Sequence, residues 1–151
     1  MLGGFILVKN ELSREIVNII KNSDALRGSN TDKIAKRMYE ILFEKFPDTK
    51  HLFENAPSNQ YMLLSDTISA YVMNIDKVEK IMPALEKIAK HHFKANVMPK
   101  DYSLVGTAFI SAIEEVLADK VTPEYIDAWR EAYMYIANIL IDMEADLYEG
   151  I

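Results

Sequence analysis

Of the three histidines in this chain, His92 is the one whose position indicates chemistry. A helical stretch leads up to it, and the inward stripe of that stretch follows i, i+4, i+7 and i+11 spacing: Ile81, Leu85, Ile88 and His92. His91 is rotated by about 100° on a helix of 3.6 residues per turn, so it falls on the solvated face. One imidazole is therefore expected to face the interior alone.

Metal sites built from several protein ligands do not fit the spacing of the candidate residues. A di-iron bundle needs paired Glu-x-x-His motifs, and only His51 has an acidic residue, Asp48, three positions before it. The His-Glu-x-x-His zinc motif and the glycine-rich phosphate loops are absent. Cysteine is absent too, which excludes thiolate metal sites and covalent c-type haem. A single inward histidine suits haem, a cofactor that brings its own equatorial ligands.

Two polar residues are placed to support an inward imidazole. Tyr102 lies ten residues after His92, just past a proline-initiated helix start, so the returning chain brings its hydroxyl close. On the last helix Asp146 shares the side of Ile139 and Met143, and a buried carboxylate needs a partner such as an imidazole N–H. This partner would fix the tautomer of a metal-binding histidine. The alternative for His92 is a core histidine satisfied by one hydrogen bond.

Three further residues are candidates for the wall that faces a ligand. Tyr39 lies in the middle of an apolar helix. It is either a hydrogen-bond donor to a bound ligand or a core tyrosine whose hydroxyl is bonded to backbone. Gln60 precedes Leu64 by four residues and Ile68 by eight, so it either tops an inward stripe or lies on the surface. Phe53 ends the short connector between these helices, which predicts its ring over the pocket mouth.

Composition narrows the possible partners and the location. A length of 151 residues predicts one domain, and a content of 50% hydrophobic residues with five Gly and five Pro favours long helices. The net charge of −6 argues against nucleic acid and anionic membranes as partners. The longest apolar runs fall short of the ~18–20 residues that span a bilayer, and the apolar start lacks the basic segment of a signal peptide. A cytoplasmic protein is expected.

Hydrophobic periodicity predicts an all-α fold, since no segment alternates with period two. Asp76 is the expected N-cap of the histidine helix, and Thr122 with Pro123 is expected to start the last helix. Residues 1–10 form an extension, a lengthened first helix or an apolar flap for self-association, and residues 11–151 form the domain. The predicted helices span about residues 11–22, 31–46, 59–74, 81–92, 99–117 and 123–148, with a short helical turn at 47–53.

Taken together, five stretches resemble one known family, the bacterial single-domain haemoglobins and the globin domain of flavohaemoglobins. The thermoglobin group is the most similar. The stretches are RMYEILFEKFP at 37–47, LF at 52–53, KIAKHH at 87–92, YSLVG at 102–106 and AWREAY at 128–133. The resemblance covers about residues 11–149. It implies the globin fold, a three-over-three helical sandwich around haem b, with a short or absent fourth helix.

The same resemblance implies roles for individual residues. His92 would be the proximal iron ligand, Phe53 the ring that packs against the haem, and Tyr39 with Gln60 the distal hydrogen-bonding pair. Leu64 would be the apolar distal neighbour. The remaining expected haem contacts are Ile68, Leu85, Ile88, Val97 and Tyr102.

The family supports its iron-bound histidine with a tyrosine and a glutamate. Tyr102 matches the tyrosine. Asp146 stands where the glutamate is expected, one methylene shorter, whereas Glu144 is rotated by about 200° from it. We therefore expect Asp146 to complete the proximal group.

The implied function is reversible binding of O2, NO and CO, with conversion of nitric oxide to nitrate. A hydrogen bond from Tyr39 to O2, worth ~1.5–3 kcal/mol, would slow O2 release roughly 10- to 150-fold. Nitrate formation needs an electron each turnover, and the chain lacks flavin and nicotinamide domains, so a separate reductase is expected. A monomer or homodimer is expected. The alternatives are an O2 carrier or scavenger without turnover and a haem-free globin-like sensor domain.

Overall fold

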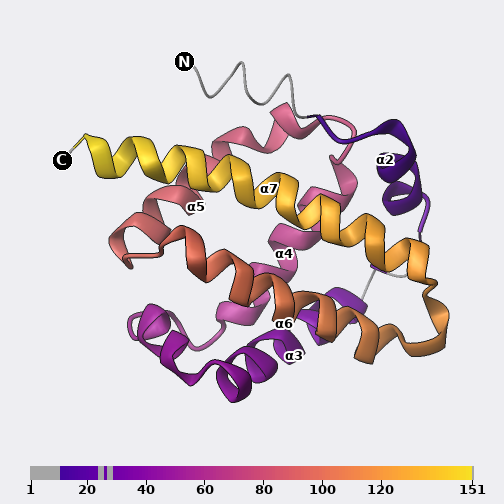
Figure 1. Ribbon diagram of the computed structural model, residues 1–151, viewed down its shortest axis with the longest axis horizontal. Coiled ribbons are helices and arrows are strands. Elements are labelled where there is room, and N and C mark those ends of the chain that lie inside the picture. Colours follow the sequence, from indigo (N-terminus) through magenta and orange to yellow (C-terminus); the bar gives the residue numbers. More distant parts are fainter. Residues whose placement is uncertain (1–10, 24–25, 27–28, 151) are drawn as a thin grey trace.

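The computed structural model describes residues 11–23, 26 and 29–150, and every regular element in these ranges is helical (Figure 1). The predicted all-α class is therefore confirmed, whereas residues 1–10 lie outside the described part. The α-helices are α2 (Arg14–Lys21), α3 (Ser29–Lys45), α4 (Gln60–Met73), α5 (Met82–Lys94), α6 (Pro99–Leu117) and α7 (Pro123–Glu149). Three 3-10 helices join them: η1 (Pro47–Phe53), η2 (Val78–Ile81) and η3 (Ala118–Lys120).

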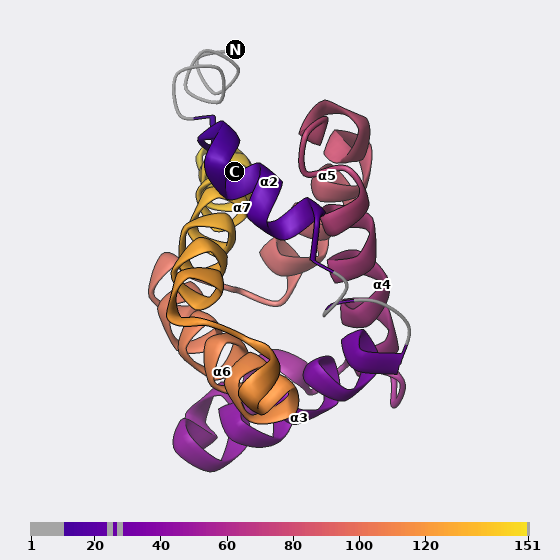
Figure 2. The same cartoon turned by 90° about the vertical axis from the view of Figure 1, so that its right-hand side faces the viewer.

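The helices surround a common interior, with α6 and α7 on one side and α4 and α5 on the other (Figure 2). The long helix α7 contacts α2, α5 and α6, while α3 packs against α4, η1 and α6. The turns at residues 54–59 take the place of a fourth helix between η1 and α4. The largest fully buried side chains come from α2, α3, α5, α6 and α7: Trp129, Ile20, Ile34, Leu42, Leu85, Ile113, Leu117 and Ile139.

Local capping sets where the helices around the candidate site begin. The Thr122 hydroxyl accepts a hydrogen bond from the Tyr125 amide at 3.1 Å and Pro123 follows it, as the sequence predicts. At the start of α6, the Asp101 carboxylate accepts from the Met98 amide at 2.8 Å. These caps fix where α6 and α7 begin.

One predicted helix start is wrong. Asp76 does not cap the histidine helix, because the 3-10 helix η2 intervenes and α5 begins at Met82, with Pro83 in its first turn. Asp76 instead forms an ion pair with Lys21 at the end of α2. The hydrogen bond from Lys21 is the main cause that lowers the pKa of the Asp76 carboxyl. The acidic side chain thus joins two segments that are far apart in the sequence.

A glycine allows α6 and α7 to approach closely. A Cβ atom on Gly106 would lie 2.7 Å from Cε2 of Tyr133, closer than two carbon atoms can pack. The Tyr133 ring also lies 5.9 Å from that of Phe109, and its hydroxyl donates a hydrogen bond to the carbonyl of Tyr102 at 2.6 Å. The missing side chain at Gly106 is therefore what places Tyr133 against Tyr102.

We expect Gly106→Ala to lower the free energy of unfolding by about 1 kcal/mol. Overpacking costs ~1–3 kcal/mol, and the ~1 kcal/mol that alanine gains over glycine in a helix offsets part of it. Urea denaturation measures the change. Gly150→Ala is the matched control, because its Cβ would come no closer than 3.4 Å to another heavy atom. A stabilised Gly106→Ala protein would contradict this account of the packing.

Candidate functional site

His92 lies in the last turn of α5, where its ring meets side chains from α6 and α7. Its Nδ1 atom is 2.8 Å from the hydroxyl oxygen of Tyr102 and 3.1 Å from Oε2 of Glu144. The Tyr102 hydroxyl donates to the same Glu144 oxygen at 2.6 Å. Tyr102 and Glu144 are both buried, while the His92 side chain keeps 34% of its surface exposed. Three polar groups from three helices therefore form one closed cluster, which we call the proximal triad.

The hydrogen bonds of the proximal triad determine the tautomer of its histidine. A carboxylate only accepts, and the single proton of the Tyr102 hydroxyl goes to Glu144. Burial, followed by the Glu144 carboxylate, raises the pKa of Tyr102, so this proton stays in place. Nδ1 of His92 must then be the donor to Glu144, which leaves the lone pair of the neutral ring on Nε2. Within the described ranges no side chain or backbone group bonds to Nε2.

The prediction that Asp146 lies beside His92 is wrong, and Glu144 takes its place. Asp146 is exposed to solvent, although Ile139 on the same side of α7 is buried. At the C-terminal end of α7, the face that carries Leu140, Glu144 and Tyr148 lies toward α5 instead. On the Ile139 side of α7, burial by neighbouring elements ends before Asp146. The Asp146 carboxylate is therefore solvated and needs no protein partner.

Two tyrosines that the sequence did not single out as site residues hold the proximal triad in place. Tyr133 donates to the backbone carbonyl of Tyr102, as described above. Tyr148 donates to the carbonyl of Val97 at 3.0 Å, and its ring lies 4.8 Å from that of Phe93. The signal available in the sequence was the residue type, because a buried tyrosine hydroxyl usually finds a hydrogen-bond partner.

A second group of predicted residues gathers where α3, η1 and α4 meet. The ring centroids of Tyr39 and Phe53 lie 5.3 Å apart at 84°, and Phe43 lies 5.5 Å from Phe53. The pKa of the Tyr39 hydroxyl is raised, because the effect of burial exceeds the opposing effect of a side-chain hydrogen bond with Gln60. The structure thus brings Tyr39, Phe53 and Gln60 together and gives Tyr39 a side-chain partner. Phe43 is the member of this group that sequence reasoning missed.

The apolar residues predicted to contact a cofactor divide into two sets. Ile68 and Leu85 are buried in the core. Leu64, Ile88 and Val97 pack against that core but stay partly exposed. Ile88 precedes His92 by one helical turn and Val97 follows it in the next loop. The partly exposed His92 therefore has incompletely buried apolar residues one turn before it and in the loop after it.

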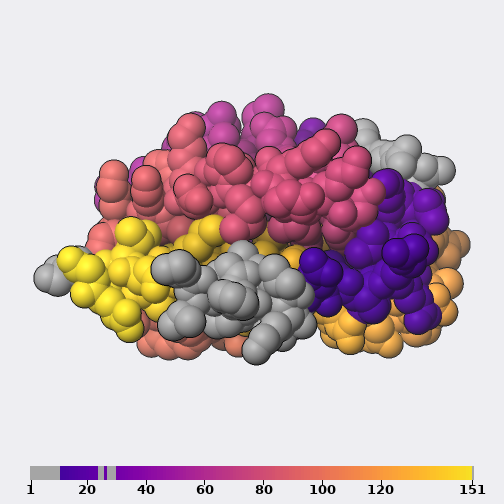
Figure 3. All heavy atoms as spheres, turned by 90° about the horizontal axis from the view of Figure 1, so that it is seen from above, coloured from indigo at the N-terminus to yellow at the C-terminus, as the bar shows by residue number. Residues whose placement is uncertain are grey.

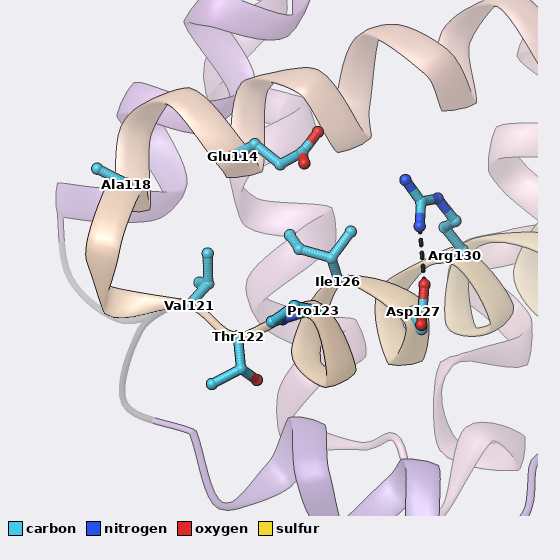
Figure 4. A pocket seen from close by; sticks show the side chains of 8 residues that line it. All are labelled: Glu114, Ala118, Val121, Thr122, Pro123, Ile126, Asp127 and Arg130. Carbon is cyan, nitrogen blue, oxygen red and sulfur yellow. Dashed lines mark hydrogen bonds and ion pairs between the residues drawn. The ribbon is translucent and has the colours of Figure 1, made fainter.

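Other features of the surface lie away from these groups. A hollow of about 390 Å³ lies where α6 ends and α7 begins, and Arg130 there pairs with Asp127 at 2.8 Å (Figure 4). None of the predicted site residues lines it. The described ranges contain no cluster of three or more metal-ligating side chains. They also contain no helix that is long and apolar enough to cross a membrane.

Comparison with known proteins shows which family the chain is similar to. The family model described as Globin matches residues 36–140. An uncharacterized globin-like protein from Aquifex aeolicus is 41% identical over 137 residues, which cover 91% of this chain and 97% of the relative. A flavohemoprotein from Rhodopirellula baltica is 36% identical over 91% of this chain but only 35% of its own length. The chain thus spans about a third of the flavohemoproteins that it matches.

Two solved structures resemble the chain over nearly their whole length. An engineered carbene transferase built on a protein of Rhodothermus marinus, provisionally described as a nitric oxide dioxygenase, superposes with a TM-score of 0.87. It is 32% identical and covers 92% of this chain and 97% of its own. A bacterial globin from Campylobacter jejuni superposes with a TM-score of 0.81 at 27% identity, covering 91% and 99%.

Replacing the two carboxylates separately tests which one completes the proximal triad. We expect Glu144→Ala to lower the free energy of unfolding by about 1.5–3 kcal/mol, because it removes hydrogen bonds to a charged group and leaves buried donors unpaired. Asp146→Ala, on the exposed side of the same helix, should change it by less than about 0.5 kcal/mol. Urea denaturation of both variants measures the difference. Equal losses would show that Glu144 has no special role in the fold.

Proposed function

Since the chain belongs to the globin family, we propose that it binds haem b with Nε2 of His92 as the axial iron ligand. A haem held there would supply an iron that binds the diatomic gases O2, NO and CO. The observation that carries the proposal is the proximal triad, because Nδ1 of His92 is held by Tyr102 and Glu144. That arrangement directs the lone pair of the ring outward through Nε2.

The residues around His92 fit such a group. The donor set is one neutral imidazole without a second protein ligand, which suits a metal that brings its own equatorial ligands. The partly exposed apolar side chains of Leu64, Ile88 and Val97 would be covered by a flat apolar ring. Each Å² of apolar surface removed from water contributes roughly 25 cal/mol. The incomplete burial of these side chains therefore favours a bound ring.

The proximal triad also sets the electronic character of the histidine. The Glu144 carboxylate accepts the Nδ1 proton and draws it away from the ring, which makes Nε2 a stronger donor. Tyr102 donates to the same carboxylate and keeps it oriented toward the ring. We infer an electron-rich proximal histidine, a property that favours reactions of a bound gas over simple release.

In the group formed by α3, η1 and α4, Tyr39 and Gln60 would supply hydrogen-bond donors to a diatomic ligand. Burial raises the pKa of the Tyr39 hydroxyl, so it remains protonated and able to donate near neutral pH. Phe53 packs edge-on against the Tyr39 ring and limits its rotation. Leu64 keeps the remaining surface apolar. We propose that this group raises O2 affinity by slowing release.

The activity we propose is nitric oxide dioxygenation, in which NO, O2 and one electron give nitrate. It is supported by the flavohemoprotein relatives and by the similarity to the Rhodothermus marinus protein. The match covers about a third of the flavohemoproteins' own length. We propose that a separate reductase supplies the electron. Reversible O2 binding without turnover is the second candidate, because the same donors would stabilise it. Consumption of NO beyond one equivalent with an added reductase separates the two.

Hemin binding tests the role of His92. Purified protein reconstituted with hemin should show a Soret band, and His92→Gly should weaken it because the axial ligand is lost. His91→Gly is the matched control, since the neighbouring ring is exposed and should leave the band unchanged. Absorption spectroscopy during hemin titration gives the measurement. A chain that gains no Soret band, or two variants that behave alike, would end the haem proposal.

The O2 dissociation rate tests the Tyr39 group. Tyr39→Phe should speed O2 release by roughly 10- to 150-fold, because a hydrogen bond to a charged acceptor worth ~1.5–3 kcal/mol is lost. Stopped-flow displacement of O2 by CO gives the rate. Tyr135→Phe on α7 also removes a tyrosine hydroxyl and should leave the rate unchanged. An unchanged rate in Tyr39→Phe would mean that Tyr39 does not reach the ligand.

A further inference from the structure

The outer face of α5 carries a row of positive side chains. Lys87, Lys90 and Lys94 follow i, i+3 and i+7 spacing, and all three are exposed. We call these three residues the lysine stripe. His91 lies within the same row and is exposed as well. The helix packs against α7 and η2, and Figure 3 shows surface of the segment around residues 80–95 beside the C-terminal part of α7.

The lysine stripe contrasts with the charge of the whole chain. The chain has a net charge of −6, whereas residues 77–100 hold six lysines against two glutamates. No ion pair to the three stripe lysines is found within the described ranges. The three ammonium groups therefore face solvent and are not paired with carboxylates of the described residues. The lysines of this segment are Lys77, Lys80, Lys87, Lys90, Lys94 and Lys100.

The stripe lies on the same helix as the proposed iron ligand. His92 is adjacent to His91 in the chain, and its side chain is itself partly exposed. A helix with its side chains is about 10–12 Å across, so a protein docked on the stripe lies within roughly one helix diameter of His92. Met98, just after the α5–α6 turn, adds a large exposed apolar side chain at this end of the helix. An apolar group beside charges is typical of weak, charge-guided interfaces.

We propose that the lysine stripe is the docking surface for an acidic one-electron carrier protein. The inference rests on the proposed function, which consumes one electron per turnover. The reduced carrier would lose one electron, and a ferric haem iron held by His92 would gain it, with no atom or proton exchanged. Complementary charge brings the two proteins together and orients the carrier toward the α5 side of the haem.

A compact acidic protein fits this surface better than an extended anionic one. Outside residues 77–100 the chain is strongly acidic, and the last turns of α7, which pack beside α5, carry Asp142, Asp146 and Glu149. A membrane or a nucleic acid would meet these carboxylates as well as the lysines and be repelled. A small carrier covers the stripe alone.

The rate of electron delivery tests the proposal on the hemin-loaded protein. The probe is a reduced plant-type [2Fe–2S] ferredoxin, an acidic one-electron carrier, mixed under CO in a stopped-flow instrument. Charge reversal of the stripe, in a Lys87→Glu, Lys90→Glu, Lys94→Glu variant, should lower the second-order rate constant at least about 10-fold at low salt. The rate should also lose most of its dependence on ionic strength.

A matched variant controls for net charge. Lys33→Glu, Lys36→Glu, Lys120→Glu changes the same number of exposed lysines on α3 and η3, and we expect it to lower the rate less than about 2-fold. Carbodiimide cross-linking adds a readout that needs no haem. It should join carboxylates of the ferredoxin to Lys87, Lys90 and Lys94, as mapped by mass spectrometry.

The outcomes separate this proposal from the proposed function. A protein that binds no hemin overturns the proposed function, and cross-links then still decide the docking surface by whether they fall on the stripe or elsewhere. If the loaded protein is reduced by dithionite but both triple variants accept electrons from ferredoxin at equal rates, the docking proposal is wrong. It is also wrong if the stripe binds phosphatidylserine vesicles and forms no cross-link to the carrier.

Discussion

The buried carboxylate of Glu144 is the constraint on which the candidate site depends. A carboxylate away from water is costly unless hydrogen bonds compensate it, and here the Tyr102 hydroxyl and Nδ1 of His92 both point at one oxygen. The interaction joins α5, α6 and α7 at one point. Because the carboxylate only accepts, it dictates the tautomer of His92, and the chemistry available at Nε2 follows from that.

Other contacts maintain the geometry that this carboxylate requires. Gly106 lets the Tyr133 ring approach α6, and the Tyr133 hydroxyl then bonds the backbone of Tyr102. Tyr148, one turn beyond Glu144, bonds the loop that follows His92. Backbone and side chains of the proximal triad are thus held from both ends. A long α7 is needed for this, because Tyr133 and Tyr148 lie four turns apart on one helix.

The two faces of α5, the helix that carries His92, differ in chemistry. Its inner side places an imidazole among partly buried apolar residues, while the side rotated by about 100° presents His91 and the lysine stripe to solvent. The second group, with Tyr39 and Gln60, comes from α3 and α4. Ligand chemistry and electron delivery are therefore proposed for two different faces of α5.

Periodicity and capping in the sequence determined the all-α class, most helix bounds, the inward direction of His92 and the approach of Tyr102. Each of these depends on residues near one another in the chain. Only the tertiary structure decided between Glu144 and Asp146, and it moved Asp76 from a helix cap to an ion pair. A repeat of 3.6 residues relates positions within one helix, but it does not say which neighbour covers which side, or where along a 27-residue helix that cover ends.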